Sequence, residues 1–365
     1  MSKRLFRSVL AAALAIRILL ILTSFGSTDA LLLMGFVRLV EHVGIARAYS
    51  FARFFNHPPL AAFVWIAADR LGSLIHLEFT DVFRLFQVVA DIASAALLWR
   101  MSKSREVVAF FFASPAAIFL SGFHCNGDPT MTALLLAAIC LQSGLLLGTA
   151  AGIKITPIPL APFFLIGMGW RRRFVFALAF GAVLALIFVP VAIKGGPVVL
   201  HNIFGYRGSG FEWGFCGMGF LTGSARFAQW YSQYGHYVVI AALVGLWIGY
   251  RAPLPAMIGT ALLAMNFFSP GFGVQYLVWP LPFFLFAVPR KLAYALNAAL
   301  SIFLFCTYTI WAGGFPWWFA DAAHHPHRIA VALLALPLWL LYGFAIVAAL
   351  RNGPRQLGPE KLAEG

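Results

Sequence analysis

Charge is scarce in this sequence of 365 residues. Only 10% of the residues are charged and just 12 are acidic, whereas 62% are hydrophobic and the mean hydropathy is +0.87. Soluble domains carry about 25% charged residues, so the composition excludes an ordinary soluble domain. A membrane span takes roughly 20 apolar residues, and a chain of this length holds about 11 to 13 such helices. The composition therefore predicts an all-α fold, a polytopic transmembrane helical bundle.

A metal-binding cysteine spacing is also absent, since the four cysteines form no CxxC pair. Cys125 and Cys216 fall in predicted outer loops, in a compartment that permits disulfides. Two free, buried thiols are the default expectation for this pair. The histidine-rich run of His324, His325 and His327 resembles a metal-binding tract, but a solvated loop is the favoured interpretation. The sequence therefore predicts no metal site, while a divalent cation remains compatible with the chain.

Positive charge exceeds negative charge by 14. A nucleic-acid partner would explain this excess, but lysine and arginine gather in short loops, as the positive-inside bias of membrane proteins predicts. We therefore expect no nucleic acid and a multi-pass protein of the bacterial inner membrane with both termini cytoplasmic. Residues 1–350 form one predicted domain and 351–365 a cytoplasmic tail. Two large loops face outward, at 25–81 and 194–236.

Two features of the first quarter of the chain stand out. Arg17 lies inside the first span, where a lone charge is costly, and Asp91 in the next span is its expected partner. The loop 25–81 is too polar to be a single span. Within it, residues 30–42 have an apolar face, and residues 58–77 are apolar but interrupted by Asp69 and Arg70. We predict interfacial helices for both segments, with the second lying on the outer interface or forming a shallow re-entrant helix.

Polar side chains gather in three predicted outer clusters on this topology. Acids, bases and aromatic rings on one face of an apolar bundle suit an anionic, sugar-bearing substrate, because arginine matches phosphate oxygens. The bland alternatives are that Asp128 caps a helix and that Arg207 and Arg226 are interface anchors. The clusters comprise Asp29, Asn56 and His57; His124, Asn126 and Asp128; and Lys194, His201, Asn202, Tyr206, Arg207, Glu212, Trp213 and Arg226.

The order of these motifs resembles the GT-C superfamily of integral membrane glycosyltransferases. The shared features are an acid soon after the first span (Ser27-Thr28-Asp29), a His-Pro-Pro-Leu element (57–60) and a second acidic outer turn (124–129). Residues 144–157 and 269–283 are similar to stretches of the bacterial mannosyltransferase-like members. The resemblance covers about three quarters of the chain. It implies a cell-envelope enzyme that uses a polyprenyl-phosphate-linked sugar and requires no cofactor.

The resemblance also implies roles for individual residues. Asp29 is the expected catalytic base for an acceptor hydroxyl, and Asp128 is expected to assist it. The displacement is expected to be direct and inverting, and the acceptor is a glycan, a glycolipid or a protein. Membrane lipid surrounds the site. The residues expected to bind the donor phosphate or sugar are His57, Arg207, Arg226, His124, Asn126, Tyr206, Trp213 and Gln275.

Three other functions fit parts of the sequence. A secondary transporter of a polar or anionic solute would use membrane-embedded charges and the proline-broken segment after residue 148. Its polar residues would lie near the midplane, however, whereas those of this chain concentrate at one interface, and no inverted repeat is visible. A lipid-linked glycan polymerase or ligase shares the substrate class. A non-catalytic scaffold would tolerate substitution of Asp29.

Overall fold

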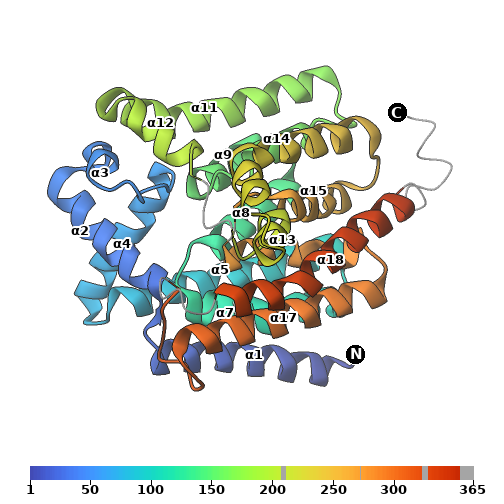
Figure 1. Cartoon of the computed structure of the whole chain (residues 1–365), viewed down its shortest axis with the longest axis horizontal. Helices are drawn as coiled ribbons and strands as arrows, with labels where there is room; N and C mark the ends of the chain where they lie inside the picture. Colours follow the sequence, from blue (N-terminus) through green and yellow to red (C-terminus); the bar gives the residue numbers. More distant parts are fainter. Residues whose placement is uncertain (207–210, 272, 323–327, 354–365) are drawn as a thin grey trace. The chain divides into compact units, whose positions relative to one another are not determined.

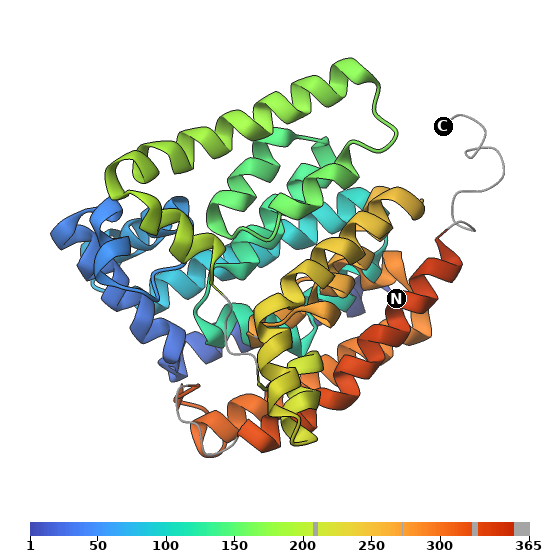
Figure 2. The ribbon, with the colours of Figure 1, turned by 45° about the horizontal axis from the view of Figure 1, so that its top comes forward.

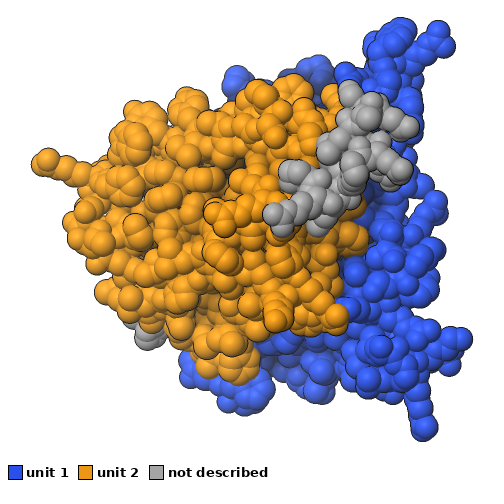
Figure 3. All heavy atoms as spheres, turned by 90° about the vertical axis from the view of Figure 1, so that its right-hand side faces the viewer, with its two compact units in different colours: residues 1–161, 168–206, 312–323 blue, residues 162–167, 207–311, 324–365 orange. Residues whose placement is uncertain are grey.

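The computed structural model of the chain describes residues 1–206, 211–271, 273–322 and 328–353. These residues are almost entirely helical, which confirms the all-α prediction. They form two compact units, which are coloured separately in Figure 3. Unit 1 contains residues 1–161, 168–206 and 312–323, and unit 2 contains residues 162–167, 207–311 and 324–365.

Unit 1 contains the N-terminal half of the helices and two short strands. The strands β1 (Gly26–Ser27) and β2 (Phe319–Ala320) pair in parallel. The helices are α1 (Lys3–Thr23), α2 (Thr28–Val43), α3 (Ile45–Phe51), α4 (Pro59–Ile75), α5 (Phe79–Ser102), α6 (Arg105–Phe112), α7 (Pro115–Phe119), the π-helical η1 (Leu120–His124), α8 (Asp128–Leu141), α9 (Gly144–Ile153), the 3-10 helix η2 (Ile158–Leu160), α11 (Trp170–Gly195) and α12 (Pro197–Phe204).

Unit 2 contains the later helices and several short 3-10 turns. The short helix α10 (Ala161–Phe164) lies at the point where the chain passes from unit 1 to unit 2. The remaining elements are α13 (Gly214–Leu221), α14 (Ala225–Gly249), α15 (Leu254–Phe268), η3 (Val274–Val278), η4 (Leu281–Phe283), α16 (Phe284–Ala287), α17 (Arg290–Ala312) and α18 (Arg328–Asn352).

Five helices of the described residues are long and apolar enough to cross a membrane: α1, α5, α11, α17 and α18. The pair formed by α6 and the continuous helix 115–124 adds a sixth if it is one span, although it bends by 46°. Four further helical segments are also apolar but shorter, at 10–17 residues. Several long apolar helices therefore define a multi-pass membrane protein.

Two apolar helical segments are broken. The first, over residues 105–124, breaks at Phe112 and resumes at Pro115, because a proline within a helix removes a backbone hydrogen bond. The second, over residues 128–153, breaks after Leu141, where Gln142 adopts a left-handed conformation with a φ of 47°. Ser143 then caps α9 by accepting a hydrogen bond from Leu146 N. Figure 2 shows α9 running alongside α11.

The first predicted outer loop folds as a helical cluster of α2, α3 and α4 (Figure 1). The expected helices over 30–42 and 58–77 correspond to α2 and α4, and α4 is not among the described helices that qualify as spans. Phe55 is fully buried at the centre of the cluster. Its ring centroid lies 4.9 Å from that of Phe36 and 6.0 Å from that of Trp65. Packing of apolar side chains therefore gives this segment its own core.

The expected pair between Arg17 and Asp91 is confirmed. Arg17 Nη2 lies 2.8 Å from Asp91 Oδ2, and the two side chains are 0% and 3% exposed. The guanidinium also donates to Ser121 Oγ and to the Phe112 carbonyl, at 2.9 and 2.8 Å. Phe112 is the last residue of α6, so Arg17 neutralises an acid and also satisfies the backbone at the break in that segment.

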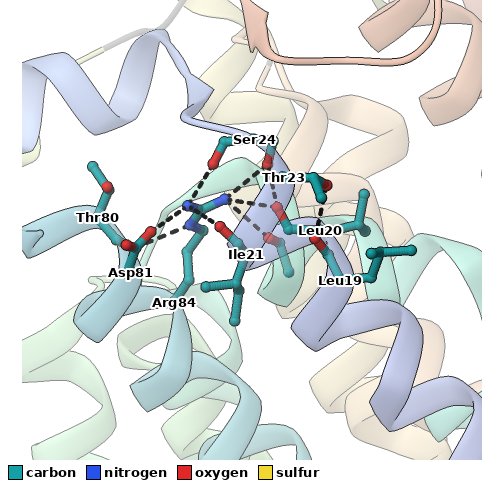
Figure 4. Close-up of polar contacts among 9 residues, drawn as sticks. Leu19, Leu20, Ile21, Thr23, Ser24, Thr80, Asp81 and Arg84 are labelled. Atoms are coloured by element: carbon teal, nitrogen blue, oxygen red, sulfur yellow. Dashed lines mark hydrogen bonds and ion pairs between the residues drawn. The ribbon is translucent and has the colours of Figure 1, made fainter. Parts of the chain in front are cut away.

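A second buried arginine, Arg84 of α5, binds the end of α1 (Figure 4). Its guanidinium donates to the carbonyl of Ser24 at 2.8 Å and to that of Ile21 at 3.1 Å. It also donates to Ser24 Oγ at 2.9 Å and pairs with Asp81 at 3.0 Å. A further bond, of 3.2 Å, reaches the carbonyl of Gly122 in η1. One side chain therefore ties the end of α1 to η1.

In unit 2, aromatic side chains donate hydrogen bonds to the free carbonyls at the end of α15. The indole of Trp213 donates to the carbonyl of Asn266 at 2.7 Å, and that of Trp339 donates to Phe267 at 2.9 Å. The hydroxyl of Tyr231 donates to the carbonyl of Phe268 at 2.9 Å. Three consecutive carbonyls that the helix itself leaves without donors are thereby satisfied.

Replacement of Arg17 alone by leucine should lower the free energy of unfolding by about 3–5 kcal/mol, because it leaves Asp91 buried without its countercharge. The double variant Arg17→Leu/Asp91→Leu should be much closer to the wild type. Chemical unfolding in detergent measures both values. Arg7→Leu, which removes an exposed arginine from the same helix, is the control. Equal losses in the single and double variants would contradict an uncompensated charge as the cause.

Candidate active site

Asp29 lies in the first turn of α2, directly after β1. A carboxylate at this end of a helix is stabilised by the helix dipole. Gly26, in β1, has a φ of +112°, and a Cβ there would lie 2.8 Å from the carbonyl oxygen of Phe123. Glycine is therefore required for β1 to approach η1 closely. This approach brings Asp29 near the end of η1 and the residues that follow it.

Two side chains from that segment hold Asp29. His124 Nε2 lies 3.3 Å from Asp29 Oδ2, and Asn126 Nδ2 donates to the same oxygen. Between them, Cys125 takes a left-handed conformation with a φ of 63°. Among the described residues, no contact reaches Asp29 Oδ1, and the side chain is 27% exposed. Asp29 therefore has one oxygen held in place and one oxygen open.

Ser27 orients His124. The Ser27 hydroxyl donates to the carbonyl of His124 at 2.6 Å, and its oxygen lies 3.2 Å from His124 Nδ1. Since its single proton is directed at the carbonyl, the serine oxygen accepts from Nδ1. Nε2, on the opposite side of the ring, faces the Asp29 carboxylate. Ser27 therefore fixes the orientation of the imidazole that faces Asp29.

The surroundings of Asp29 keep its carboxylate ionised. Burial alone would raise its pKa, but the nearby charge of His124, the hydrogen bonds from His124 and Asn126, and the charge of Lys154 outweigh that effect. Together they lower the pKa of Asp29 from 3.8 to about 2. At neutral pH the open oxygen therefore carries negative charge and can accept a proton.

Asp128, unlike Asp29, forms an ion pair with a lysine. It is fully buried, and its two carboxylate oxygens each lie 2.9 Å from Lys154 Nζ. The N-cap of α8 is Gly127, so the helix-capping alternative for Asp128 does not describe its contacts. Lys154 stands at the end of α9, where the chain becomes extended. Its charge lowers the pKa of both Asp29 and His57, which places it in the same electrostatic neighbourhood.

His57 is half-buried just before Pro58 and Pro59. Burial and, secondly, the charge of Lys154 lower its pKa to about 3, whereas Asp29 acts in the opposite direction. Its imidazole is therefore neutral at physiological pH. The ring meets Trp65 edge-on at 4.9 Å, and the His57 carbonyl accepts from the Tyr49 hydroxyl at 2.6 Å. These contacts fix the ring through the core of the first-loop cluster.

Tyr206 also belongs to this neighbourhood. Burial of its hydroxyl and the charge of Asp29 raise its pKa, while a hydrogen bond with Asn56 acts to lower it. The residue as a whole is 46% exposed. The structure thus gathers six of the expected site residues in unit 1: Asp29, His57, His124, Asn126, Asp128 and Tyr206.

Three other expected residues lie in unit 2. Arg226 is exposed near the start of α14, and Gln275 is half-buried in η3. Trp213 is 2% exposed and supports the end of α15, so its ring has no open face for a sugar. Arg207 lies outside the described residues, as do His324, His325 and His327. The donor-binding roles of Arg226, Gln275 and Arg207 stay predictions.

Cys125 and Cys216 are both buried and free, so the disulfide considered between them is not formed. No group of three or more His, Cys, Asp or Glu side chains within the described ranges could hold a metal ion.

A segment distant in sequence holds β1, and sequence reasoning did not identify it. We call residues 315–322 the strap. Beyond the strand pairing, Phe25 N donates to the carbonyl of Trp318 at 2.7 Å, and Ala322 N donates to Thr28 Oγ1 at 2.8 Å. The buried Trp317 packs on Phe123, with ring centroids 5.2 Å apart. The strap therefore contacts residues on both sides of the start of α2, the helix that carries Asp29.

No protein-family model matches the sequence, and no curated protein matches it. The class that fold and site define is therefore a multi-pass, all-α membrane protein with a cluster of ionised and polar side chains around Asp29.

The depressed pKa of Asp29 predicts a pH-dependent contribution to stability. Because the folded pKa of about 2 lies below the ordinary value of 3.8 for an aspartate, the stabilisation is complete above pH about 4 and is lost as pH falls towards 2. Its size should be on the order of 2 kcal/mol. The measurement is the difference in unfolding free energy between wild type and Asp29→Asn across this range. His124→Gln should shrink the difference; a difference independent of pH would contradict the assignment.

Removal of the Thr28 hydroxyl should loosen the strap. Thr28→Val deletes the acceptor for Ala322 N, and one such hydrogen bond contributes about 0.5–1.5 kcal/mol. We expect roughly fivefold faster hydrogen exchange at Phe25 and Gly26, since 1.4 kcal/mol corresponds to a factor of ten. Thr23→Val, whose hydroxyl bonds only within α1 to Leu19, is the control. Unchanged exchange in Thr28→Val would show that the strap does not hold β1.

Proposed function

We propose that this chain is an integral membrane glycosyltransferase. It moves a hexose, such as mannose, from a polyprenyl-phosphate donor to an acceptor hydroxyl at the outer face of the bacterial inner membrane. The observation that carries the proposal is the state of Asp29, an ionised and partly exposed carboxylate with one oxygen held and the other open. The resemblance of residues 27–29 and 57–60 to GT-C enzymes supplies the reaction class.

Asp29 acts as the general base. Transfer forms a bond between the acceptor oxygen and the anomeric carbon, and it breaks the bond from that carbon to the donor phosphate oxygen. The hydroxyl proton passes to Asp29, and the bonding electrons leave with polyprenyl phosphate. A pKa near 2 makes Asp29 a weak base towards a free alcohol. The hydroxyl becomes strongly acidic only as its new bond forms, so a late proton transfer suits this carboxylate.

The neighbours of Asp29 supply orientation and charge. His124 and Asn126 fix the carboxylate before substrate arrives, which removes an entropic cost from the reaction. The ammonium of Lys154 favours negative charge on the leaving phosphate, and the neutral His57 offers a further hydrogen-bond donor. Asp128 holds Lys154 through both of its oxygens. Its own carboxylate is therefore occupied, so Asp128 positions Lys154 instead of orienting the acceptor or donor hydroxyls.

A single displacement with one open carboxylate inverts the anomeric centre. A double displacement would need a second carboxylate as nucleophile, and in the described part of the cluster Asp128 is buried against Lys154. The sugar transferred, and whether the acceptor is a glycan, a glycolipid or a protein, depend on contacts beyond this carboxylate.

Loss of the base should abolish most of the transfer. In membranes supplied with a labelled polyprenyl-phosphate sugar, Asp29→Asn should reduce the rate by about 10²–10⁴-fold, the usual contribution of general-base catalysis. Asp128→Asn should reduce it less, because it only loosens Lys154. Asp69→Asn, a half-buried acid in the same predicted outer loop, is the matched control and should keep full activity.

Two outcomes would decide against this function. Wild-type transfer by Asp29→Asn, at equal expression, would remove Asp29 as the base. Absence of transfer by the wild type with every polyprenyl-phosphate sugar supplied would argue against the enzyme class and favour solute transport, which an uptake assay in proteoliposomes would then measure.

A further inference from the structure

Two arginines and two phenylalanines are exposed at the end of α3. Arg47 and Phe51 are four residues apart and so share one face of the helix. Arg53 and Phe54 form the tip of the next turn, which is closed by a hydrogen bond of 2.9 Å from Phe55 N to the Ala52 carbonyl. Phe51 and Phe54 are 70% and 74% exposed. We call these four residues the basic–aromatic turn.

Packing beneath this turn holds its shape. Asn202 of α12 donates to the carbonyls of Tyr49 and Ala52, at 2.8 and 3.4 Å. Phe55, the next residue after the turn tip, is 0% exposed, and its ring meets that of Tyr49 at 4.5 Å. Tyr49 and Phe55 pack into the core beneath the turn, and this packing leaves Phe51 and Phe54 at the surface.

The charges of the turn have no partner within the described residues. No carboxylate there lies within ion-pair distance of Arg47 or Arg53, whereas the exposed Arg70 of α4 lies 3.7 Å from Glu41. Arginines in a predicted outer loop also run against the usual inward bias of positive charge. Unpaired arginines beside exposed aromatic rings are characteristic of segments that lie in the membrane interface.

We propose that the basic–aromatic turn docks on the anionic phospholipid headgroups of the bilayer. Phe51 and Phe54 enter the boundary between headgroups and acyl chains, and Arg47 and Arg53 bind lipid phosphates. Charge complementarity favours an anionic lipid over a neutral one. A bilayer is favoured over a protein partner because the same chain carries five helices apolar enough to cross it. The proposal concerns bulk phospholipid and does not depend on sugar transfer.

Hydrogen exchange on the full-length protein in nanodiscs tests this interface. The two discs compared contain phosphatidylcholine alone or phosphatidylcholine mixed with phosphatidylglycerol. Amides of residues 50–55 should exchange several-fold more slowly in the anionic discs. In Arg47→Gln/Arg53→Gln the slowing should disappear. Native mass spectrometry of the detergent-solubilised protein should show phosphatidylglycerol affinity falling roughly fivefold for each arginine removed, the effect expected for a cation at an anionic leaflet.

Two matched variants distinguish the effect of the arginine charges from that of the aromatic side chains. Arg70→Gln removes the same charge from the same loop and should keep the slowing, because Arg70 is paired with Glu41. Phe51→Ser/Phe54→Ser should weaken protection in both discs. Unfolding temperatures close to that of the wild type would show that these surface variants are folded.

Three results would overturn the proposal. The first is equal protection in neutral and anionic discs, and the second is equal loss in Arg70→Gln and the double arginine variant. The third is protection that appears only when each disc contains two copies of the protein, which would assign the turn to an interface between copies.

Discussion

The fold depends on how broken helices satisfy their last carbonyl groups away from water. A helix leaves about four carbonyls without internal donors at its end, and a membrane offers no water to replace them. Arg84 supplies donors to the end of α1, and Arg17 supplies one at the end of α6. In unit 2, Trp213, Trp339 and Tyr231 do the same for α15. Specific side chains therefore stabilise the irregular backbone at the ends of α1, α6 and α15.

Arg84 connects this constraint to the candidate active site. It binds Ser24, which lies two residues before β1, and Gly122, which lies two residues before His124. The segment that leads to Asp29 and the segment that carries its partner are thus fixed to one guanidinium. Gly26 permits their close approach, and the strap covers the far side of β1. The site geometry therefore follows from the way two helices end.

The sequence predicted features that depend on composition or on isolated charges. Arg17 needed a buried acid as a partner, and Asp91 in the next span was the best placed. Features set by a few local contacts were missed, such as the break after Leu141. The strap was missed because β1 and β2 are nearly the whole chain apart. Lys154 matched a motif, but only the structure pairs it with Asp128.

Asp29 and Asp128 differ in burial and in the contacts of their carboxylate oxygens. Asp128 is fully buried, and both of its carboxylate oxygens bind one lysine, Lys154. Asp29 contacts Asn126 and His124 through one oxygen, and its side chain remains partly exposed. Of these two acids, only Asp29 combines a fixed oxygen with a partly exposed side chain. Asp128 contributes indirectly, because the lysine that it orients adds to the field around Asp29.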